Sequence, residues 1–257
     1  NKQGELTPPN INFLYQADTS YQHLHSVRLF QQKDSLFTSN QAPIAYDQHL
    51  GFAVSTYNHF LRGLRQISGA SLQELGIEIF PIMAHGLGWR GVQMYLFNYK
   101  RYSNGFPAFS PLDTVLYFAD NTPDGYGGFD LYKTTVKKDG QGGYEVTLPQ
   151  NLGSKINTAG DEICPFMDSL GTLYFTSDYH EGFGNYDIFL THSSDTGWTE
   201  VQNLGAGINS PYDDFYFIID NTQKSGYFSS NRPNGKGDYD IYGFRLTNPK
   251  QRITDLT

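Results

Sequence analysis

The chain has 257 residues, of which 16% are aromatic, and its formal net charge at pH 7 is −8. This negative charge disfavours a nucleic-acid partner, and since no stretch approaches the roughly 18 uninterrupted apolar residues of a membrane-spanning helix, we expect no membrane span. The single cysteine excludes a disulfide within the chain, and the abundance of Tyr, Phe and Gly favours short strands joined by tight turns.

A repeated pattern is visible in the second half of the chain. Tyr117, Tyr174 and Tyr227 occupy the centres of the similar segments TVLYFADN, GTLYFTSD and KSGYFSSN, and they lie 57 and 53 residues apart. A unit of four short strands that recurs every ~40–50 residues is typical of a β-propeller blade, whereas tandem β-sandwiches do not repeat at so short a period. The pattern predicts an all-β fold, a five-bladed β-propeller of four-stranded antiparallel blades.

In chain order, the repeat divides residues 1–257 into the blades of a single domain. Residues 66–83 match residues 202–219 without a gap, which predicts a blade boundary near residue 70 and a short second blade. That blade is either truncated or lacks a loop within residues 84–104. We expect a ring-closing strand within 1–19 and blades near 20–70, 71–104, 105–157, 158–210 and 211–250.

The last blade has little chain after Leu246, so another segment must supply its outer strand. Residues 10–16 (NINFLYQ) have strand character and would pair the last blade with the first, while residues 251–256 (QRITDL) are the rival segment. Closure matters because a lone four-stranded sheet leaves open edges and an unburied face.

Three glycine-rich turns each precede an aspartate at one repeated position, namely Asp130, Asp187 and Asp240. Glycine adopts the positive φ that tight turns need, and a short carboxylate can accept backbone N–H groups of the turn or of a neighbouring blade. A calcium site is the alternative, but the three turns share no second acidic position and do not fit the spacing of an EF-hand loop. We therefore interpret these aspartates as structural caps and expect no metal and no cofactor.

Acidic pairs occur at Asp161–Glu162 and at Asp213–Asp214, 52 residues apart. Paired carboxylates serve glycoside hydrolysis, but a catalytic pair needs two different environments, and these pairs occupy the same place in successive blades. The repeat therefore favours a non-enzymatic protein. A carbohydrate-binding or glycoside-hydrolysing propeller is the alternative.

The loops that lead into the first strand of each blade are expected to line the mouth of the propeller. An acidic mouth would suit a cationic peptide or an amine-bearing glycan. Arg232 is expected at the other end of the blades. The candidate binding residues are Asp161, Glu162, Tyr212, Asp213, Asp214 and Arg232.

Cysteine and histidine are two further residue types that could act as reactive groups. Cys164 lies in the apolar run EICPFMD, which favours core packing over a reactive thiol. His23 and His25 would share one face of a strand, but two ligands without a third do not make a metal site.

The segments DEICPFMDSLGTLYFTSDYHEGFGNYDIFLTH and GWTEVQNLGAGINSPYDDFYFIIDNTQKSGYFSSNRPNGKGDYDIYGF carry a family resemblance. From about residue 105 to 246 the chain resembles the WD40-like (PD40, TolB-type) propeller repeats of Bacteroidetes OmpA-family proteins, most closely those of the type IX secretion system. The resemblance implies a periplasmic scaffold, held at the outer membrane by parts outside this chain. It also implies a partner in the envelope or the secretion system, such as an outer-membrane protein, with peptidoglycan bound only through a flanking domain.

Overall fold

The computed structural model describes residues 44–47, 50–59, 74–83, 86–87, 92–93, 102–140, 144–195, 197–246 and 253. Apart from a single 3-10 residue at position 253, the regular structure in these ranges is β-strand, arranged in four antiparallel sheets. The expected all-β class is therefore confirmed. Within the same ranges, no helix is long and apolar enough to pass through a bilayer.

The first sheet crosses the boundary that the sequence predicted between blades one and two. Its strands are β1 (Ile44–Asp47), β2 (Phe52–His59), β3 (Glu74–Met83), β4 (Gly86–Leu87) and β5 (Val92–Gln93).

β2 and β3 are antiparallel neighbours along their length, from Phe52 opposite Pro81 to His59 opposite Glu74. The predicted boundary at residue 70 therefore falls between two paired strands and is wrong. Residues 78–83 belong to the third strand of a sheet, whereas their counterparts in the gapless match, residues 214–219, form a first strand. Alternating apolar residues indicate a strand but do not say which place it takes in a sheet.

The later sheets follow the repeat more closely. The outer strand of the second and of the third sheet is divided into two short pieces, both paired with the third strand. The second sheet contains β6 (Asn104–Phe109), β7 (Val115–Asp120), β8 (Asp130–Lys138), β9 (Tyr144–Val146) and β10 (Gln150–Asn151); the third contains β11 (Glu162–Met167), β12 (Thr172–Ser177), β13 (Asp187–Ser194), β14 (Gly197–Trp198) and β15 (Gln202–Asn203); the fourth contains β16 (Asp214–Ile219), β17 (Ser225–Ser230) and β18 (Asp240–Arg245).

The closing segments lie mostly outside the described residues. Residues 10–16 and all but one of residues 251–256 are among them, and so the choice of closing strand and the count of five blades stay predictions. Ile253 is described: its side chain is fully buried in the core between the third and fourth sheets, beside Phe217 and Phe228.

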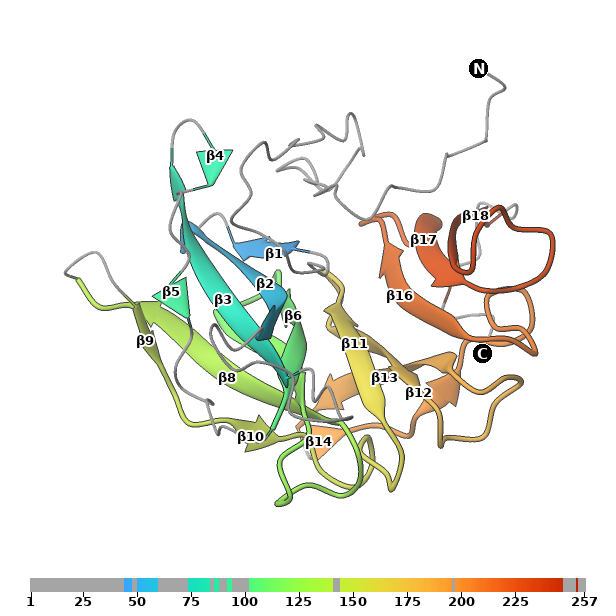
Figure 1. Cartoon of the computed structure of the whole chain (residues 1–257), viewed down its shortest axis with the longest axis horizontal. Coiled ribbons are helices and arrows are strands. Elements are labelled where there is room, and N and C mark those ends of the chain that lie inside the picture. The colour runs from blue at the N-terminus through green and yellow to red at the C-terminus, as the bar shows by residue number, and fades with distance from the viewer. Residues whose placement is uncertain are drawn as a thin grey trace, which may run out of the picture.

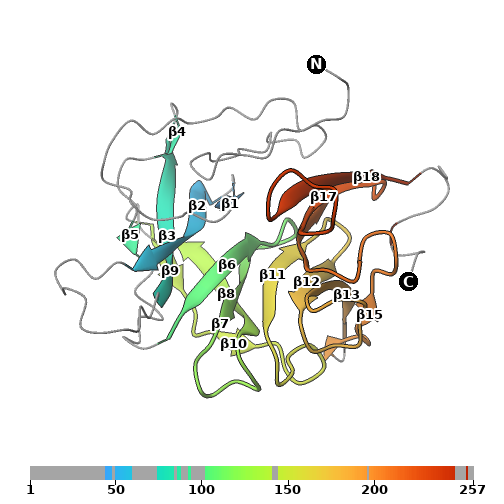
Figure 2. The same cartoon turned by 45° about the vertical axis from the view of Figure 1, so that its right-hand side comes forward.

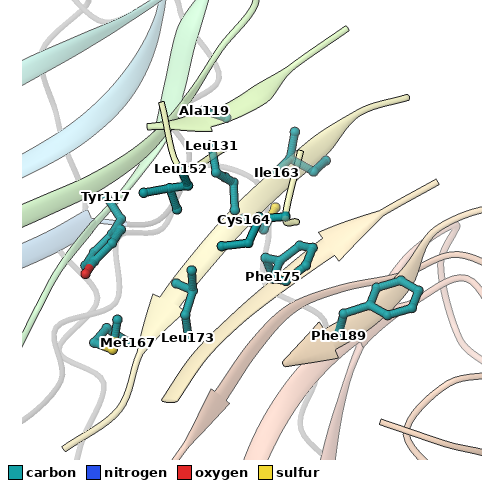
Figure 3. Close-up of a cluster of buried hydrophobic side chains, with 11 residues drawn as sticks. Tyr117, Ala119, Leu131, Leu152, Ile163, Cys164, Met167, Leu173, Phe175 and Phe189 are labelled. Carbon is teal, nitrogen blue, oxygen red and sulfur yellow. The ribbon is translucent and has the colours of Figure 1, made fainter. Parts of the chain in front are cut away.

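Neighbouring sheets pack face to face in chain order, as Figures 1 and 2 show from blue to red. On β7, Leu116 and Phe118 join the core shared with the first sheet, whereas Tyr117 and Ala119 join the core shared with the third. Successive side chains of a strand point to opposite faces, and so the middle strand of the sheet is buried on both sides. Figure 3 shows the core between the second and third sheets, to which Tyr117 and Leu173 contribute from opposite sides.

A β-bulge recurs in the first strand of three successive sheets. It places Phe106, Cys164 and Tyr216 at φ values of 55°, 53° and 51°. The rings of Phe106 and Tyr216 have centroids 6.2 Å apart, although their sheets are separated by the sheet that carries Cys164. The bulges therefore bring the inner edges of three sheets together, and the core position expected for Cys164 is confirmed.

Candidate binding surface

The glycine-rich turns are held by the aspartates that follow them. Asp187 Oδ2 accepts the backbone N–H groups of Phe183 at 2.5 Å and of Gly184 at 3.0 Å. A side chain at Gly184 would overlap the carbonyl of Tyr212, so glycine lets the turn approach the loop that enters the next sheet. The equivalent carboxylates are Asp130, which accepts from Tyr126, and Asp240, which accepts from Lys236 and Gly237.

Glu162 and Asp214, the inner members of the two acidic pairs, are fully buried. Glu162 accepts the N–H and the hydroxyl of Thr158, at 2.7 and 2.6 Å, and the hydroxyl of Ser177 at 2.7 Å. Burial raises the pKa of Glu162, while these hydrogen bonds act in the opposite direction. Asp214 accepts the N–H of Ser210 at 2.7 Å and its hydroxyl at 2.9 Å. Both carboxylates fix the loop before the first strand and do not face a ligand.

Arg232 lies beside Asp214, with Nη2 2.6 Å from Asp214 Oδ1. The same nitrogen donates to the carbonyl of Ile208 at 2.6 Å, and the guanidinium carbon lies 4.8 Å from the ring centroid of Phe228 and 5.1 Å from that of Tyr242. The expectation that Arg232 would lie at the other end of the blades was wrong. First and second strands are antiparallel, so the end of one meets the start of the other.

Asp161 and Asp213, the outer members of the pairs, are partly exposed and bonded to tyrosines. Asp161 Oδ2 accepts the hydroxyl of Tyr186 at 2.9 Å, and Asp213 Oδ2 accepts that of Tyr239 at 2.9 Å. The N–H of Asp161 donates to Asp178 Oδ1 at 2.7 Å. Burial, the bond to Asp161 and the charges of Asp161, Asp178 and Asp213 raise the pKa of Tyr186.

Aromatic rings connect the two tyrosines. The ring centroid of Phe215 lies 4.9 Å from that of Tyr186 and 5.5 Å from that of Tyr239. Phe215 and Tyr186 are partly exposed, and Tyr239 is exposed. We call this group the tyrosine–aspartate surface; it consists of Asp161, Asp178, Tyr186, Asp213, Phe215 and Tyr239.

Sequence reasoning found only part of this surface. It selected Asp161 and Asp213 but missed Tyr186 and Tyr239, each of which directly precedes a turn-capping aspartate. That position is aromatic in three successive repeats, which is the signal that could have found them. Tyr212 is exposed on the adjoining loop, where its N–H donates to the hydroxyl of Ser210 at 3.3 Å.

In the part of the chain that the structure describes, His, Cys, Asp and Glu side chains form no group of three or more that could hold a metal ion.

Comparison with known proteins gives the fold. No family model and no curated protein matches the chain. Among solved structures, a protein assigned as TolB from Agrobacterium tumefaciens is similar, with a TM-score of 0.51 and 11% identity over 94% of this chain and 78% of that chain.

Two α-L-arabinofuranosidases are similar at lower TM-scores. The enzyme from Lactobacillus brevis has a TM-score of 0.47 and 11% identity, over 89% of this chain and 81% of its own. The GH93 enzyme from Fusarium graminearum, solved with arabinobiose, has a TM-score of 0.48 and 11% identity, over 93% of this chain and 67% of its own. At such identities a likeness shows the fold alone, and the chain has a TolB-like β-propeller fold.

Proposed function

We propose that this chain is a non-catalytic protein-interaction propeller of an OmpA-family envelope protein and acts as a scaffold in type IX secretion. Its location would be the periplasm, with attachment to the outer membrane through parts outside this chain. Its partner would be an envelope or secretion-system protein. The TolB-like fold and the resemblance of residues 105–246 to the repeats of that family support the proposal.

The inner and outer carboxylates of the two acidic pairs differ in burial, and this difference supports the proposed role in protein binding. The inner carboxylates, Glu162 and Asp214, are buried in hydrogen bonds that hold the loops. The outer carboxylates, Asp161 and Asp213, remain partly exposed beside aromatic rings. Repetition therefore builds a surface of charge and rings at one end of the third and fourth sheets, as a docking site requires.

Glycoside hydrolysis fits these carboxylates poorly. It needs one carboxylic acid and one carboxylate in unlike surroundings. Asp161 and Asp213 have like surroundings, since each accepts a tyrosine hydroxyl at 2.9 Å. The arrangement favours binding over hydrolysis.

Affinity capture from an envelope extract tests the proposal. The native chain is compared with a double variant, Asp161→Asn with Asp213→Asn. The charge-matched control is Asp195→Asn with Glu145→Gln, which removes two exposed carboxylates, one on the β13–β14 hairpin and one on β9. We expect one envelope protein to be retained by the native chain and the control and lost by the double variant. Identical capture by all three chains, or hydrolysis of arabino-oligosaccharides by the native chain, would contradict the proposal.

A further inference from the structure

We infer that the tyrosine–aspartate surface receives a cationic side chain, above all an arginine, from the docked partner; this inference rests on the proposed docking function. Phe215 lies on β16, and the other five residues of the surface lie directly before β11, β13, β16 and β18 or directly after β12, in the third and fourth sheets (Figure 1).

The aromatic part of the surface offers ring faces to a cation. Tyr186, Phe215 and Tyr239 follow one another at centroid distances of 4.9 and 5.5 Å. Their interplanar angles are 39° and 61°, so the rings form an angled series and not one flat stack. The face of an aromatic ring carries partial negative charge and attracts a guanidinium or ammonium group placed over it.

The carboxylates supply charge that the described residues do not neutralise. The two ion pairs found among the described residues are Lys155–Glu200 and Arg232–Asp214, and neither involves this surface. Asp178 accepts a hydrogen bond through Oδ1 and Asp213 accepts through Oδ2. Asp161 uses both of its oxygens, Oδ1 for the N–H of Phe129 and Oδ2 for the hydroxyl of Tyr186. Oδ2 of Asp178 and Oδ1 of Asp213 are therefore available to the N–H groups of an arginine.

The chain already uses the same combination internally. Arg232 stands over the rings of Phe228 and Tyr242, at 4.8 and 5.1 Å, with its Nη2 2.6 Å from a carboxylate oxygen of Asp214. The exposed surface repeats these components, two or more rings beside a carboxylate, without a guanidinium from the described chain. The surface therefore has the composition of an arginine-binding site.

The second sheet lacks this surface. Where the third sheet has Asp161 and Tyr186, the second has Ser103 and Phe129, so it carries neither the carboxylate nor the hydroxyl that holds it. Of the second, third and fourth sheets, only the third and fourth therefore carry the proposed contact.

Titration of the full chain with hexa-arginine, followed by calorimetry, tests the inference. Tyr239→Ala and Asp213→Asn are the test variants: Tyr239 is exposed, and an asparagine at 213 keeps an acceptor for the neighbouring hydroxyl. Asp195→Asn removes the same charge at the other end of the sheet. We expect each test variant to raise Kd for hexa-arginine at least tenfold, the control to stay within twofold, and hexa-glutamate not to bind.

Tyr239→Phe separates the ring from the hydroxyl. Because the ring face makes the contact, this variant is expected to bind hexa-arginine within threefold of the native chain. If Asp195→Asn and Asp213→Asn weaken the binding of hexa-arginine equally, the site is overturned, because the peptide is then attracted by the overall charge of the protein. Absence of hexa-arginine binding to the native chain would overturn it as well.

Two further results distinguish a failure of the proposed cation site from a failure of the proposed docking function. If Tyr239→Ala loses hexa-arginine but still captures the envelope partner at native level, the cation site is overturned as the docking contact while the docking function stands. If neither ligand is bound by the native chain, both are overturned.

Discussion

Asp120 on β7 lies directly opposite Asp130 on β8, and both carboxyl groups are buried. In the third and fourth sheets the residue opposite the turn-capping aspartate is a serine, Ser177 or Ser230. Oδ1 of Asp130 has no hydrogen-bond partner. The second sheet therefore places an additional buried acid where its neighbours place a neutral hydroxyl.

Asp120→Ser is expected to stabilise the protein at pH 7, by about 1 kcal/mol, because it removes a buried charge that faces another acid. The N–H of Thr122, which donates to Asp120 at 2.8 Å, keeps an acceptor, as Tyr179 does with Ser177 at 3.1 Å. Urea denaturation of both chains measures the difference. A less stable variant would show that Asp120 makes a net favourable contribution.

The pH dependence of stability has a defined sign at this pair. Burial raises the pKa of Asp120 and of Asp130 above the usual 3.8, so the folded chain holds protons more tightly than the unfolded chain. The free energy of unfolding contributed by the pair is therefore highest at acid pH and falls as pH rises from about 3.8 through the raised values. Asp120→Ser should flatten this fall in denaturation curves taken between pH 4 and 8, and an unchanged slope would contradict the assignment.

Arg232→Ala is expected to destabilise the protein by about 3 kcal/mol, because it leaves the buried carboxylate of Asp214 without its cation. The double variant with Asp214→Ala measures the coupling: if the unpaired charge causes the loss, the double variant loses less than the sum of the single ones. Strictly additive losses in chemical denaturation would assign the effect to the lost packing on Phe228 and Tyr242.

Asp187→Ala is expected to cost about 2 kcal/mol, since the N–H groups of Phe183 and Gly184 lose their acceptor. Asp195→Ala, on an exposed hairpin, serves as the control and should change stability by less than about 0.5 kcal/mol. Equal effects of the two substitutions on the urea midpoint would remove the capping role.

The thiol of Cys164 should react slowly with Ellman's reagent in the folded chain. The side chain is buried in the core between the second and third sheets, and burial raises its pKa, so both access and thiolate are lacking. In urea above the unfolding midpoint the reaction should be fast. Rapid labelling of the native chain would place Cys164 at the surface instead.

The sequence pattern predicted the strands of the last three sheets because the same residue types recur at equivalent positions of each sheet. Tyr117, Tyr174 and Tyr227 recur on the middle strand, and the capping aspartates recur after glycine turns whose tight backbone tolerates few residue types. The first sheet was misread because apolar alternation is the same in a first and in a third strand. Which residues pair across strands, such as Phe52 with Pro81, depends on the folded structure and cannot be predicted from residue spacing.

The candidate surface was predicted in part for a related reason. Repetition marked Asp161, Glu162, Asp213 and Asp214 together, but it could not separate the buried member of each pair from the partly exposed one. The antiparallel pairing of the first and second strands determines which member is buried, because it brings Ser177 and Arg232 beside the inner carboxylates. Contacts between sheets likewise bring Phe215 between Tyr186 and Tyr239.

Site-specific photo-crosslinking in the envelope tests the central claim most directly. A benzophenone amino acid is placed at Tyr239, on the tyrosine–aspartate surface, or at Leu148, an exposed residue between β9 and β10 on the outer edge of the second sheet. If the protein docks a partner through the proposed surface, position 239 yields a discrete protein adduct and position 148 does not. A discrete adduct from position 148 with none from position 239 would contradict the account.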